Sequence, residues 1–331
     1  MLLSSIASFI ITIFVFNFAC FPSDTNCFSK NFKQGFKIFG AAEESEGKIL
    51  GAEESVNEIA KAFLPESEDK PAAPQKKEGA EEFEIAAKSA VAIDEETGVF
   101  LFAHNPDEST PIASLTKLMT ALVFLEYNPG WDIPYEIKRE DRREGGRIYL
   151  FLGEKVTVKD LFYLSLVASD NTATVALAKS TGFNEEEFVK KMNEKAGSLG
   201  LTKTNFRDPV GLDNNNVSTA REIANLAKIS LAHEDIRQAT MSKDYQFKTL
   251  AGKRKVVSST DYLLKNFPSN GLKIIGGKTG YTDLAGYCFA GKFSDNSGRE
   301  IITAILGGKS SEERFQKTRD LAEWAYNSYV W

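Results

Sequence analysis

The sequence predicts an α+β fold in which an antiparallel sheet is built from both ends of the folded body and a helical subdomain fills the middle. Three observations lead to this prediction. Two apolar runs joined by a turn open the body, a block of helices follows, and strand-like runs with a closing helix end the chain. The 331 residues are 42% apolar, which gives ample core for about two domains.

The elements follow from apolar periodicity and from turn residues, taken in chain order. A hairpin is expected over residues 89–94 and 98–102, and a buried helix from Ser114 to about Tyr127. The remaining helices are expected over 159–168, 171–180, 184–199 and 218–232. The remaining strands are expected over 245–250, 272–275, 286–293 and 300–306.

The closing helix has the clearest start signal. Ser310 followed three residues later by Glu313 is typical of a capping box. One face of this helix is apolar, with the side chains of Phe315, Thr318, Leu321, Ala322 and Ala325.

The N-terminal segment is expected to stand apart from the body. Residues 1–22 are predicted to be a membrane anchor or signal peptide, because Met1 to Phe21 holds no charge and about 20 apolar residues can cross a bilayer. A buried helix is the third alternative. The nearest basic residues follow the run, which by the positive-inside tendency favours a cytoplasmic body, so the orientation stays open.

Residues 23–82 are predicted to be an acidic, disordered linker. Residues 41–82 hold twelve Asp or Glu against five Lys, with few aromatic residues. The catalytic domain is then expected over residues 83–331.

Composition excludes several classes of function. The net charge of −6 argues against a nucleic-acid partner. Three cysteines (Cys20, Cys27 and Cys288) make neither a disulfide framework nor a zinc site. With only His104 and His233 in the chain, a Ser-His-Asp triad is not expected, so hydrolytic chemistry needs another base.

Ser114-Leu115-Thr116-Lys117 is the first candidate motif. On a helix that starts at Ser114, a residue three positions on lies on the same face, so the Lys117 amine can reach the Ser114 hydroxyl. Apolar neighbours would lower the pKa of that amine and make it a base. Taken alone, the spacing is more often a capping serine with a surface lysine.

Two further motifs follow along the chain. Ser169-Asp170-Asn171 lies at a break between predicted helices, where it could present a hydroxyl and an amide or merely cap a helix. Lys278-Thr279-Gly280 follows Gly276-Gly277 and precedes Tyr281, and Lys with Thr can bind a carboxylate. The glycine spacing of a phosphate-binding loop is not met.

The three motifs in this order are those of class A β-lactamases and penicillin-binding proteins. The surrounding residues, 113–121, 208–212, 218–224 and 277–288, resemble the D-alanyl-D-alanine carboxypeptidases among the low-molecular-weight penicillin-binding proteins. The resemblance runs from about residue 84 to the C-terminus. It implies a β-lactamase/transpeptidase-like fold.

The resemblance also implies an activity: removal of the terminal D-alanine from a peptidoglycan stem peptide through an acyl-enzyme. It implies Ser114 as the nucleophile, Lys117 as its base and Ser169 as the proton carrier to the leaving amine. The implied substrate-binding residues are Asn171, Lys278, Thr279, Gly280, Tyr281 and Arg314. The N–H groups of Ser114 and Tyr281 would form an oxyanion hole. β-Lactam antibiotics are the implied acylating inhibitors, and neither cofactor nor metal is implied.

Alternatives and departures remain. For Arg314, a solvated helix charge is the other interpretation. Residues 258–264 read Ser-Ser-Thr-Asp-Tyr-Leu-Leu where the family often has Asn-x-Asn before Leu-Leu. A class A β-lactamase needs a glutamate after the second motif, but 203–208 holds none and Glu222 lies too far on, so slow penicillin turnover is expected.

A DD-endopeptidase that cuts peptidoglycan cross-links uses the same residues and stays open. A catalytically dead binding module is disfavoured, because every catalytic position is filled. The closing helix lies at the C-terminus, so the N-terminal segment is expected to anchor the enzyme on the extracytoplasmic face of the bacterial membrane, or to be cleaved on secretion.

Overall fold

The computed structural model describes residues 72–266 and 271–331. The predicted anchor or signal peptide over 1–22, and the predicted linker up to residue 71, lie outside the described residues. In the part of the chain that is described, no helix is both long and apolar enough to cross a membrane.

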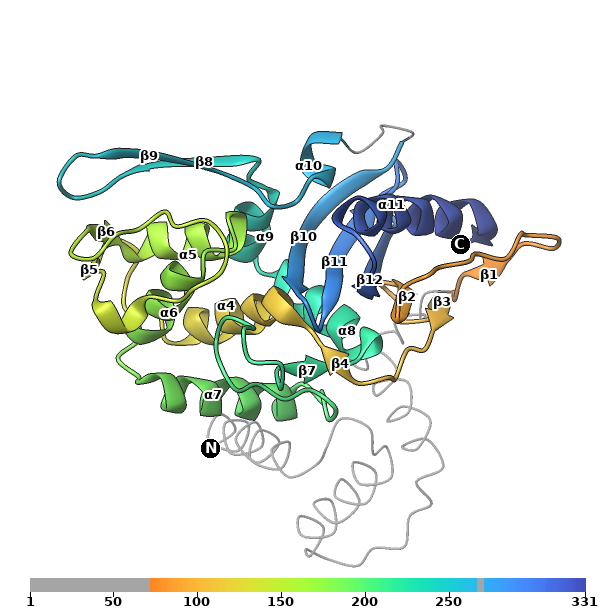
Figure 1. Cartoon of the computed structure of the whole chain (residues 1–331). Helices are drawn as coiled ribbons and strands as arrows, with labels where there is room; N and C mark the ends of the chain where they lie inside the picture. The colour runs from red at the N-terminus through yellow and green to blue at the C-terminus, as the bar shows by residue number, and fades with distance from the viewer. Residues whose placement is uncertain (1–71, 267–270) are drawn as a thin grey trace, which may run out of the picture. The chain divides into compact units, whose positions relative to one another are not determined.

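The central element is a five-stranded antiparallel sheet with strand order β10-β11-β12-β2-β3 (Figure 1). Strands β2 (Ser89–Asp94) and β3 (Phe100–His104) come from the start of the described chain. Strands β10 (Lys273–Thr282), β11 (Gly286–Ser294) and β12 (Glu300–Gly308) come from its end. The prediction of a sheet built from both chain ends within an α+β fold is therefore confirmed.

Helices cover both faces of this sheet. Side chains alternate between the faces along a strand, so Val91 packs in the core cluster of α8 (Ala220–Ala232) and its neighbour Ala92 in that of α11 (Ser311–Ser328). Every residue of β2 is consequently buried. The predicted apolar face of the closing helix is confirmed, because Phe315, Leu321, Ala322 and Ala325 belong to the second cluster.

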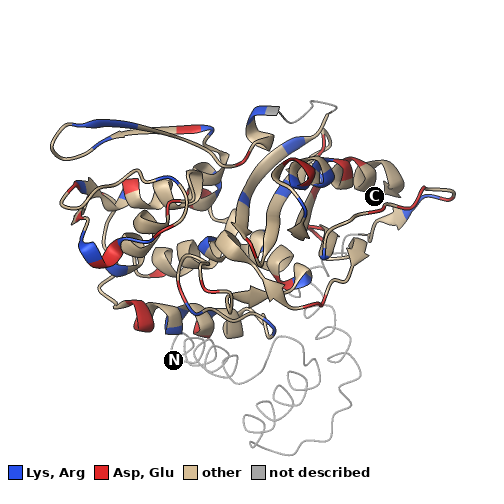
Figure 2. Ribbon diagram, in the orientation of Figure 1, with Lys and Arg blue, Asp and Glu red and all other residues tan. Residues whose placement is uncertain are grey.

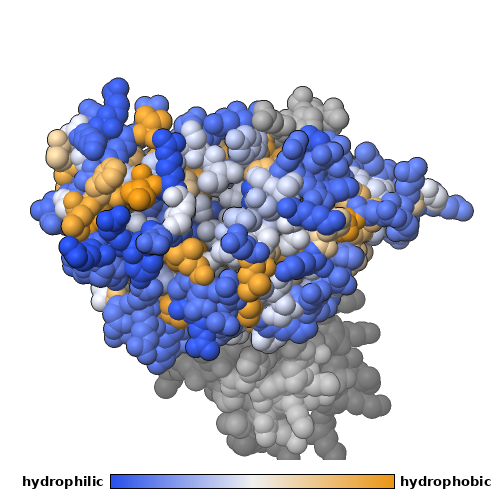
Figure 3. Space-filling view, in the orientation of Figure 1, coloured by the Kyte–Doolittle hydropathy of each residue, from blue (hydrophilic) through white to orange (hydrophobic). Residues whose placement is uncertain are grey.

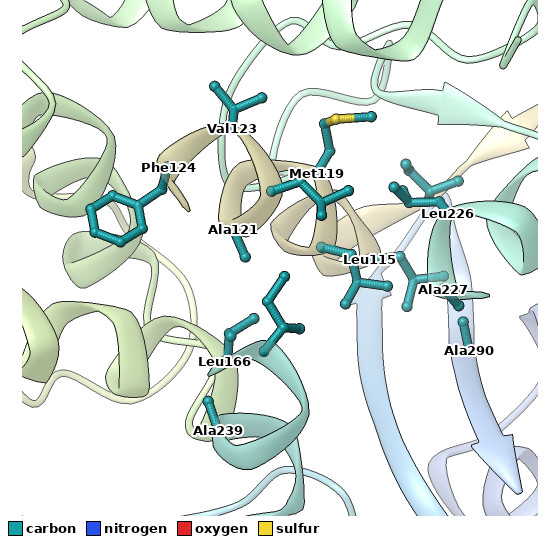
Figure 4. Close-up of a cluster of buried hydrophobic side chains, with 14 of the residues drawn as sticks. Leu115, Met119, Ala121, Val123, Phe124, Leu166, Leu226, Ala227, Ala239 and Ala290 are labelled. Carbon is teal, nitrogen blue, oxygen red and sulfur yellow. The ribbon is translucent and has the colours of Figure 1, made fainter. Parts of the chain in front are cut away.

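Helix α4 (Thr116–Glu126) lies at the centre of the helical subdomain and is buried from Thr116 to Phe124. In Figure 4, side chains of the Leu115–Phe124 segment point toward α5, α8 and strand β11. A helix that is buried on every side is held by packing rather than by an amphipathic stripe. The first motif therefore begins at the N-terminal end of the most enclosed helix of the subdomain.

The other helices of the subdomain surround α4. They are α5 (Val158–Val167), α6 (Asn171–Ser180), α7 (Glu185–Ser198) and α9 (Glu234–Met241). Side-chain caps fix the starts of α5, α6 and α7; Asn184, for example, accepts the Glu187 N–H at 2.9 Å, and Ser310 likewise accepts the Glu313 N–H at 3.0 Å before α11. The predicted start of the closing helix is thus confirmed.

Small two-stranded sheets complete the body. They pair β1 (Gln75–Lys76) with β13 (Tyr329–Val330), β4 (Thr110–Pro111) with β7 (Val217–Ser218), β5 (Pro134–Glu136) with β6 (Lys155–Thr157), and β8 (Asp244–Lys248) with β9 (Arg254–Ser258). Two 3-10 turns, η1 (Ala113–Leu115) and η2 (Arg139–Asp141), and a short helix α10 (Leu263–Asn266) are also present.

The β8–β9 hairpin pairs with no strand of the main sheet. Residues 243–255 hold five Lys or Arg against one Asp, visible as blue segments in Figure 2. Apolar side chains gather at the same end of the body (Figure 3), and Lys253 and Lys255 lie over the Phe151 ring at 5.3 and 5.1 Å. Clustered lysines on such an edge discourage pairing with another chain.

Two sequence predictions need correction. The predicted linker extends too far, because β1 pairs with β13 and the Glu81 carbonyl accepts the Trp324 indole N–H at 2.7 Å. Contacts with a helix more than 200 residues away cannot be read from local composition. Strand β10 is also longer than the predicted 272–275 and continues to Thr282. Its glycines weaken the sequence pattern that would have predicted this continuation.

Candidate active site

Ser114 lies in the 3-10 turn η1, directly before α4. Its neighbour Ala113 has a φ of 48°, a conformation that non-glycine residues rarely adopt. Such local strain persists only where the surroundings enforce it, and it is common next to reactive groups. The turn presents the Ser114 hydroxyl to Lys117, whose Nζ lies 2.7 Å from Ser114 Oγ.

Lys117 is completely buried and has two more hydrogen-bond partners. Its Nζ donates to Asn171 Oδ1 at 2.9 Å and to the carbonyl oxygen of Val210 at 2.8 Å. A neutral amine has two N–H donors and one lone pair. With both donors taken by Asn171 and Val210, the lone pair is left for the hydrogen of the Ser114 hydroxyl.

The environment favours that neutral form. Burial lowers the pKa of Lys117 to about 7, and the attraction of Asp208 and Asp170 opposes this shift. A large share of the amine is therefore unprotonated at neutral pH. The prediction that apolar surroundings would turn this lysine into a base is supported by its complete burial.

The second motif lies at the junction of α5 and α6, as predicted. Ser169 has a φ of 55° and its Oγ accepts a hydrogen bond from Lys278 Nζ at 2.9 Å. The Asp170 carboxylate caps α6 by accepting the Ala173 N–H at 2.6 Å. Both interpretations of this tripeptide therefore apply, since its middle residue caps the helix while its outer residues face the two lysines.

Asn171 joins the second motif to a neighbouring loop. Its Nδ2 donates to the carbonyl oxygens of Glu144 and Gly145 at 3.3 and 3.2 Å, while its Oδ1 accepts from Lys117. The side-chain amide is thereby held in one orientation.

The third motif lies on β10. Lys278 is buried, and its Nζ also donates to the Thr279 carbonyl at 3.0 Å. Burial lowers its pKa well below the usual value, the positive charges of Lys117 and Arg314 add to this effect, and Asp261 opposes it. Gly280 allows β10 to approach η1, because a Cβ there would lie 2.9 Å from the Ile112 carbonyl oxygen and 3.2 Å from Ser114 N.

The remaining predicted residues lie around this strand. Thr279 Oγ1 is 2.7 Å from Thr260 Oγ1, and the Tyr281 side chain is half exposed, with its hydroxyl donating to Asp283. Arg314 is buried and donates to the carbonyl oxygens of Gly280 and Cys288 at 3.1 and 3.3 Å. The alternative that Arg314 is a solvated helix charge is therefore wrong.

Sequence reasoning gave no role to the loop at residues 208–212. The Asp208 carboxylate accepts the N–H groups of Val210, Gly211 and Leu212 at 2.6, 2.5 and 3.0 Å, which folds the loop so that the Val210 carbonyl meets Lys117. A partner that is a backbone carbonyl leaves no side-chain signal. In the sequence, this loop is indicated only by Asp208 followed by Pro-Val-Gly.

The structure also shows what the Glu222 carboxylate and the Cys288 thiol contact. The Glu222 carboxylate accepts hydrogen bonds from Lys203 N at 2.9 Å and Thr204 Oγ1 at 2.6 Å. It therefore stabilises the segment that contains these two residues. Among the described residues, no three His, Cys, Asp or Glu side chains form a group that could hold a metal ion. Cys288 is buried on β11, consistent with a packing role.

A serine and a buried lysine, next to a second serine–lysine pair on a five-stranded sheet, define the class of penicillin-binding serine peptidases. Solved structures agree. A Streptomyces DD-transpeptidase is similar with a TM-score of 0.70 and 27% identity, covering 75% of this chain and 99% of its own. A D-alanyl-D-alanine carboxypeptidase of Mycobacterium tuberculosis is similar with a TM-score of 0.69 and 26% identity, covering 76% and 96%.

Sequence comparison gives the family. The D-alanyl-D-alanine carboxypeptidase family matches residues 75–310, and the chain belongs to it. The carboxypeptidase DacF of Bacillus subtilis is 34% identical over 267 residues, which cover 78% of this chain and 67% of that protein. A D-alanyl-D-alanine endopeptidase of Pseudomonas aeruginosa is 34% identical over 253 residues, covering 75% and 79%.

Proposed function

We propose that this serine peptidase removes the terminal D-alanine from peptidoglycan stem peptides through an acyl-enzyme on Ser114. The observation that carries the proposal is the bond between the Ser114 hydroxyl and the buried Lys117 amine. The neutral amine takes the hydroxyl proton as Oγ attacks the carbonyl between the two D-alanines.

The developing oxyanion is stabilised by the backbone N–H groups of Ser114 and Tyr281. The contact of Gly280 with the Ser114 backbone supports this, because it brings β10 against η1. A donor of this kind is typically worth roughly 3 kcal/mol of transition-state stabilisation.

The proton that Lys117 accepts is passed by Ser169, with help from Lys278, to the amine of the leaving D-alanine, which restores neutral Lys117. The bond of 2.9 Å between Ser169 and Lys278 and the burial of Lys278 support this role. Water then hydrolyses the acyl-enzyme and returns Ser114 to its free form.

The terminal carboxylate of the substrate binds at Thr279. The paired hydroxyls of Thr260 and Thr279 support this, as do Lys278 and Arg314, whose side chains donate to carbonyl oxygens of the same strand. Asn171, whose side-chain oxygen accepts a hydrogen bond from Lys117 beside the serine, holds the substrate backbone. β-Lactams, which also carry a carboxylate, acylate Ser114 in place of the peptide.

The test is D-alanine release from a peptide that ends in D-Ala-D-Ala. Ser114→Ala is expected to abolish release, because no other nucleophile replaces the hydroxyl. Ser198→Ala is the matched control, since that serine lies exposed on α7 and bonds only its own helix. Release that survives Ser114→Ala would overturn the mechanism.

Cleavage of cross-links is the second candidate, and the similarity to an endopeptidase favours it. A cross-linked stem-peptide dimer distinguishes the two activities. A carboxypeptidase releases D-alanine from monomers and leaves the dimer intact, whereas an endopeptidase converts the dimer to monomers.

We also propose that residues 1–22 hold the enzyme at the extracytoplasmic face of the membrane or direct its secretion. The uncharged run from Met1 to Phe21 supports this. Cell fractionation with alkaline extraction tests it. An anchored protein stays with the membrane and a cleaved one appears outside the cell, whereas a cytosolic location would contradict the proposal.

A further inference from the structure

The Asp261 side chain is a buried carboxyl that the proposed mechanism does not use. It lies between β9 and α10 and is 3% exposed. Its Oδ1 accepts the Leu263 N–H at 2.9 Å, while its Oδ2 is buried without a hydrogen-bond partner in the described structure. A buried carboxyl oxygen that lacks a partner is costly, so its presence calls for an electrostatic reason.

This carboxyl lies directly beside the third motif. A Cβ built on Gly277, the residue before Lys278, would be 3.1 Å from Asp261 Oδ2. The preceding residue, Thr260, contacts Thr279 through their hydroxyls. Residues 260 and 261 therefore run along β10 at the end of the site where the proposed function places the ligand carboxylate.

Two basic side chains act electrostatically on the carboxyl, Lys278 from β10 and Arg314 from α11. Electrostatic attraction links Asp261 with both of them. The positive charge of Lys117 contributes to the lowered pKa of Lys278. Cys288, which faces Arg314, is a neutral thiol because burial raises its pKa to about 11.

Asp261 can change its charge near neutral pH. Burial raises its pKa to about 7, although the Leu263 N–H, Arg314 and Lys278 each favour the ionised form. Below that pH the carboxyl is neutral, and above it the carboxyl carries a negative charge that offsets the charge of Arg314.

Resting on the proposed function, we infer that Asp261 is a positioning residue that controls how strongly the Thr279 end of the site attracts a ligand carboxylate. Ionised Asp261 competes with the ligand carboxylate for the positive charge of Arg314. Neutral Asp261 leaves that charge to the ligand. The ionisation of Asp261 and the binding of the ligand carboxylate are thereby coupled. Ionised Asp261 weakens binding of the ligand, and a bound ligand carboxylate disfavours ionisation of Asp261.

Asp261→Asn tests this in the full chain. The variant keeps the acceptor for Leu263 N and removes the charge. The dissociation constant of the benzylpenicillin encounter complex, obtained from the saturation of acylation, is compared with that of benzylpenicillin methyl ester. At about pH 8.5 the variant should bind benzylpenicillin about tenfold more tightly than the wild type, and at about pH 5.5 equally. The ester should show no difference at either pH.

Asp160→Asn is the matched control, because that buried carboxylate accepts the Thr157 N–H in the capping box of α5 and also accepts the Tyr245 hydroxyl. Equal binding by Asp261→Asn and the wild type at both values of pH, or an equal effect on the ester, would overturn the inference. Failure of the wild type itself to form an adduct would instead overturn the proposed function.

A second measurement serves if Asp261→Asn does not fold. The carboxyl carbon of Asp261 in the wild type can be titrated by NMR, with and without a bound ligand carboxylate. The inference requires the ligand to raise the midpoint of that titration, and an unchanged midpoint would contradict it.

Discussion

At the scale of single residues, burial accounts for most of the chemistry of the site. Lys117 and Lys278 are both buried, and in each case burial is the main cause of a lowered pKa. The sequence predicted both lysines and both serines, because motif spacing places them. It could not reveal Val210 or the Thr260 contact with Thr279, since these partners are set by the fold.

Acylation of Ser114 is expected to accelerate as the pH rises through about 7. The reason is that Lys117, with its pKa near that value, accepts a proton only in its neutral form. Lys117→Arg should slow acylation by roughly 10²-fold or more, because arginine stays protonated. Stopped-flow labelling with a fluorescent penicillin measures both, and a rate independent of pH between about 5.5 and 9 would contradict the assignment.

At the scale of elements, the site depends on close approaches between loops. Helix starts were predictable where a capping side chain precedes the helix, as Ser310 does for α11. Strand β10 was only partly predictable, because its glycines, of which Gly280 lets it contact η1, weaken the strand signal. The loop at 208–212 is held by the Asp208 carboxylate, and its contact with the η1 turn fixes its position.

Gly211→Ala tests that loop. Gly211 has a φ of +88°, and a Cβ there would lie 1.9 Å from the Ala113 carbonyl oxygen. The loop must therefore move and withdraw the Val210 carbonyl from Lys117. Unfolding free energy should fall by about 3 kcal/mol, and acylation of Ser114 should slow.

Gly200→Ala is the matched control. Gly200 also has a positive φ, +72°, but an added Cβ would meet nothing within 4 Å. Its cost should be the backbone strain alone, about 1 kcal/mol, with acylation unchanged. Denaturant unfolding and penicillin labelling measure the pair, and equal effects of the two substitutions would refute the proposed contact.

At the scale of the whole molecule, the sheet joins the two ends of the described chain. This was predicted from element order, because strand-like runs at both ends flank a block of helices. The packing of residues 75–83 against α11 was not, since their acidic, proline-containing surroundings are typical of a linker. Phe83 contacts both Phe102 and Trp324, with ring centroids 5.4 and 5.7 Å apart.

A chain that begins at residue 84 should consequently be less stable than one that begins at residue 72. It lacks β1, the bond from Lys77 N to the Ser328 carbonyl at 2.8 Å, and the Phe83 ring. The melting temperature should fall by roughly 5 °C, with penicillin labelling retained below the transition. Differential scanning calorimetry of the two chains measures this, and equal melting temperatures would show that the segment adds nothing.

The most direct test of the central claim is mass spectrometry of the full chain after exposure to benzylpenicillin, with peptide mapping of the adduct. We expect one penicilloyl group, located on Ser114 and slow to hydrolyse, because Glu222 is engaged with Lys203 and Thr204 and is not available to activate water. An adduct on another residue, or no adduct at all, would contradict the assignment of Ser114 and Lys117 as nucleophile and base.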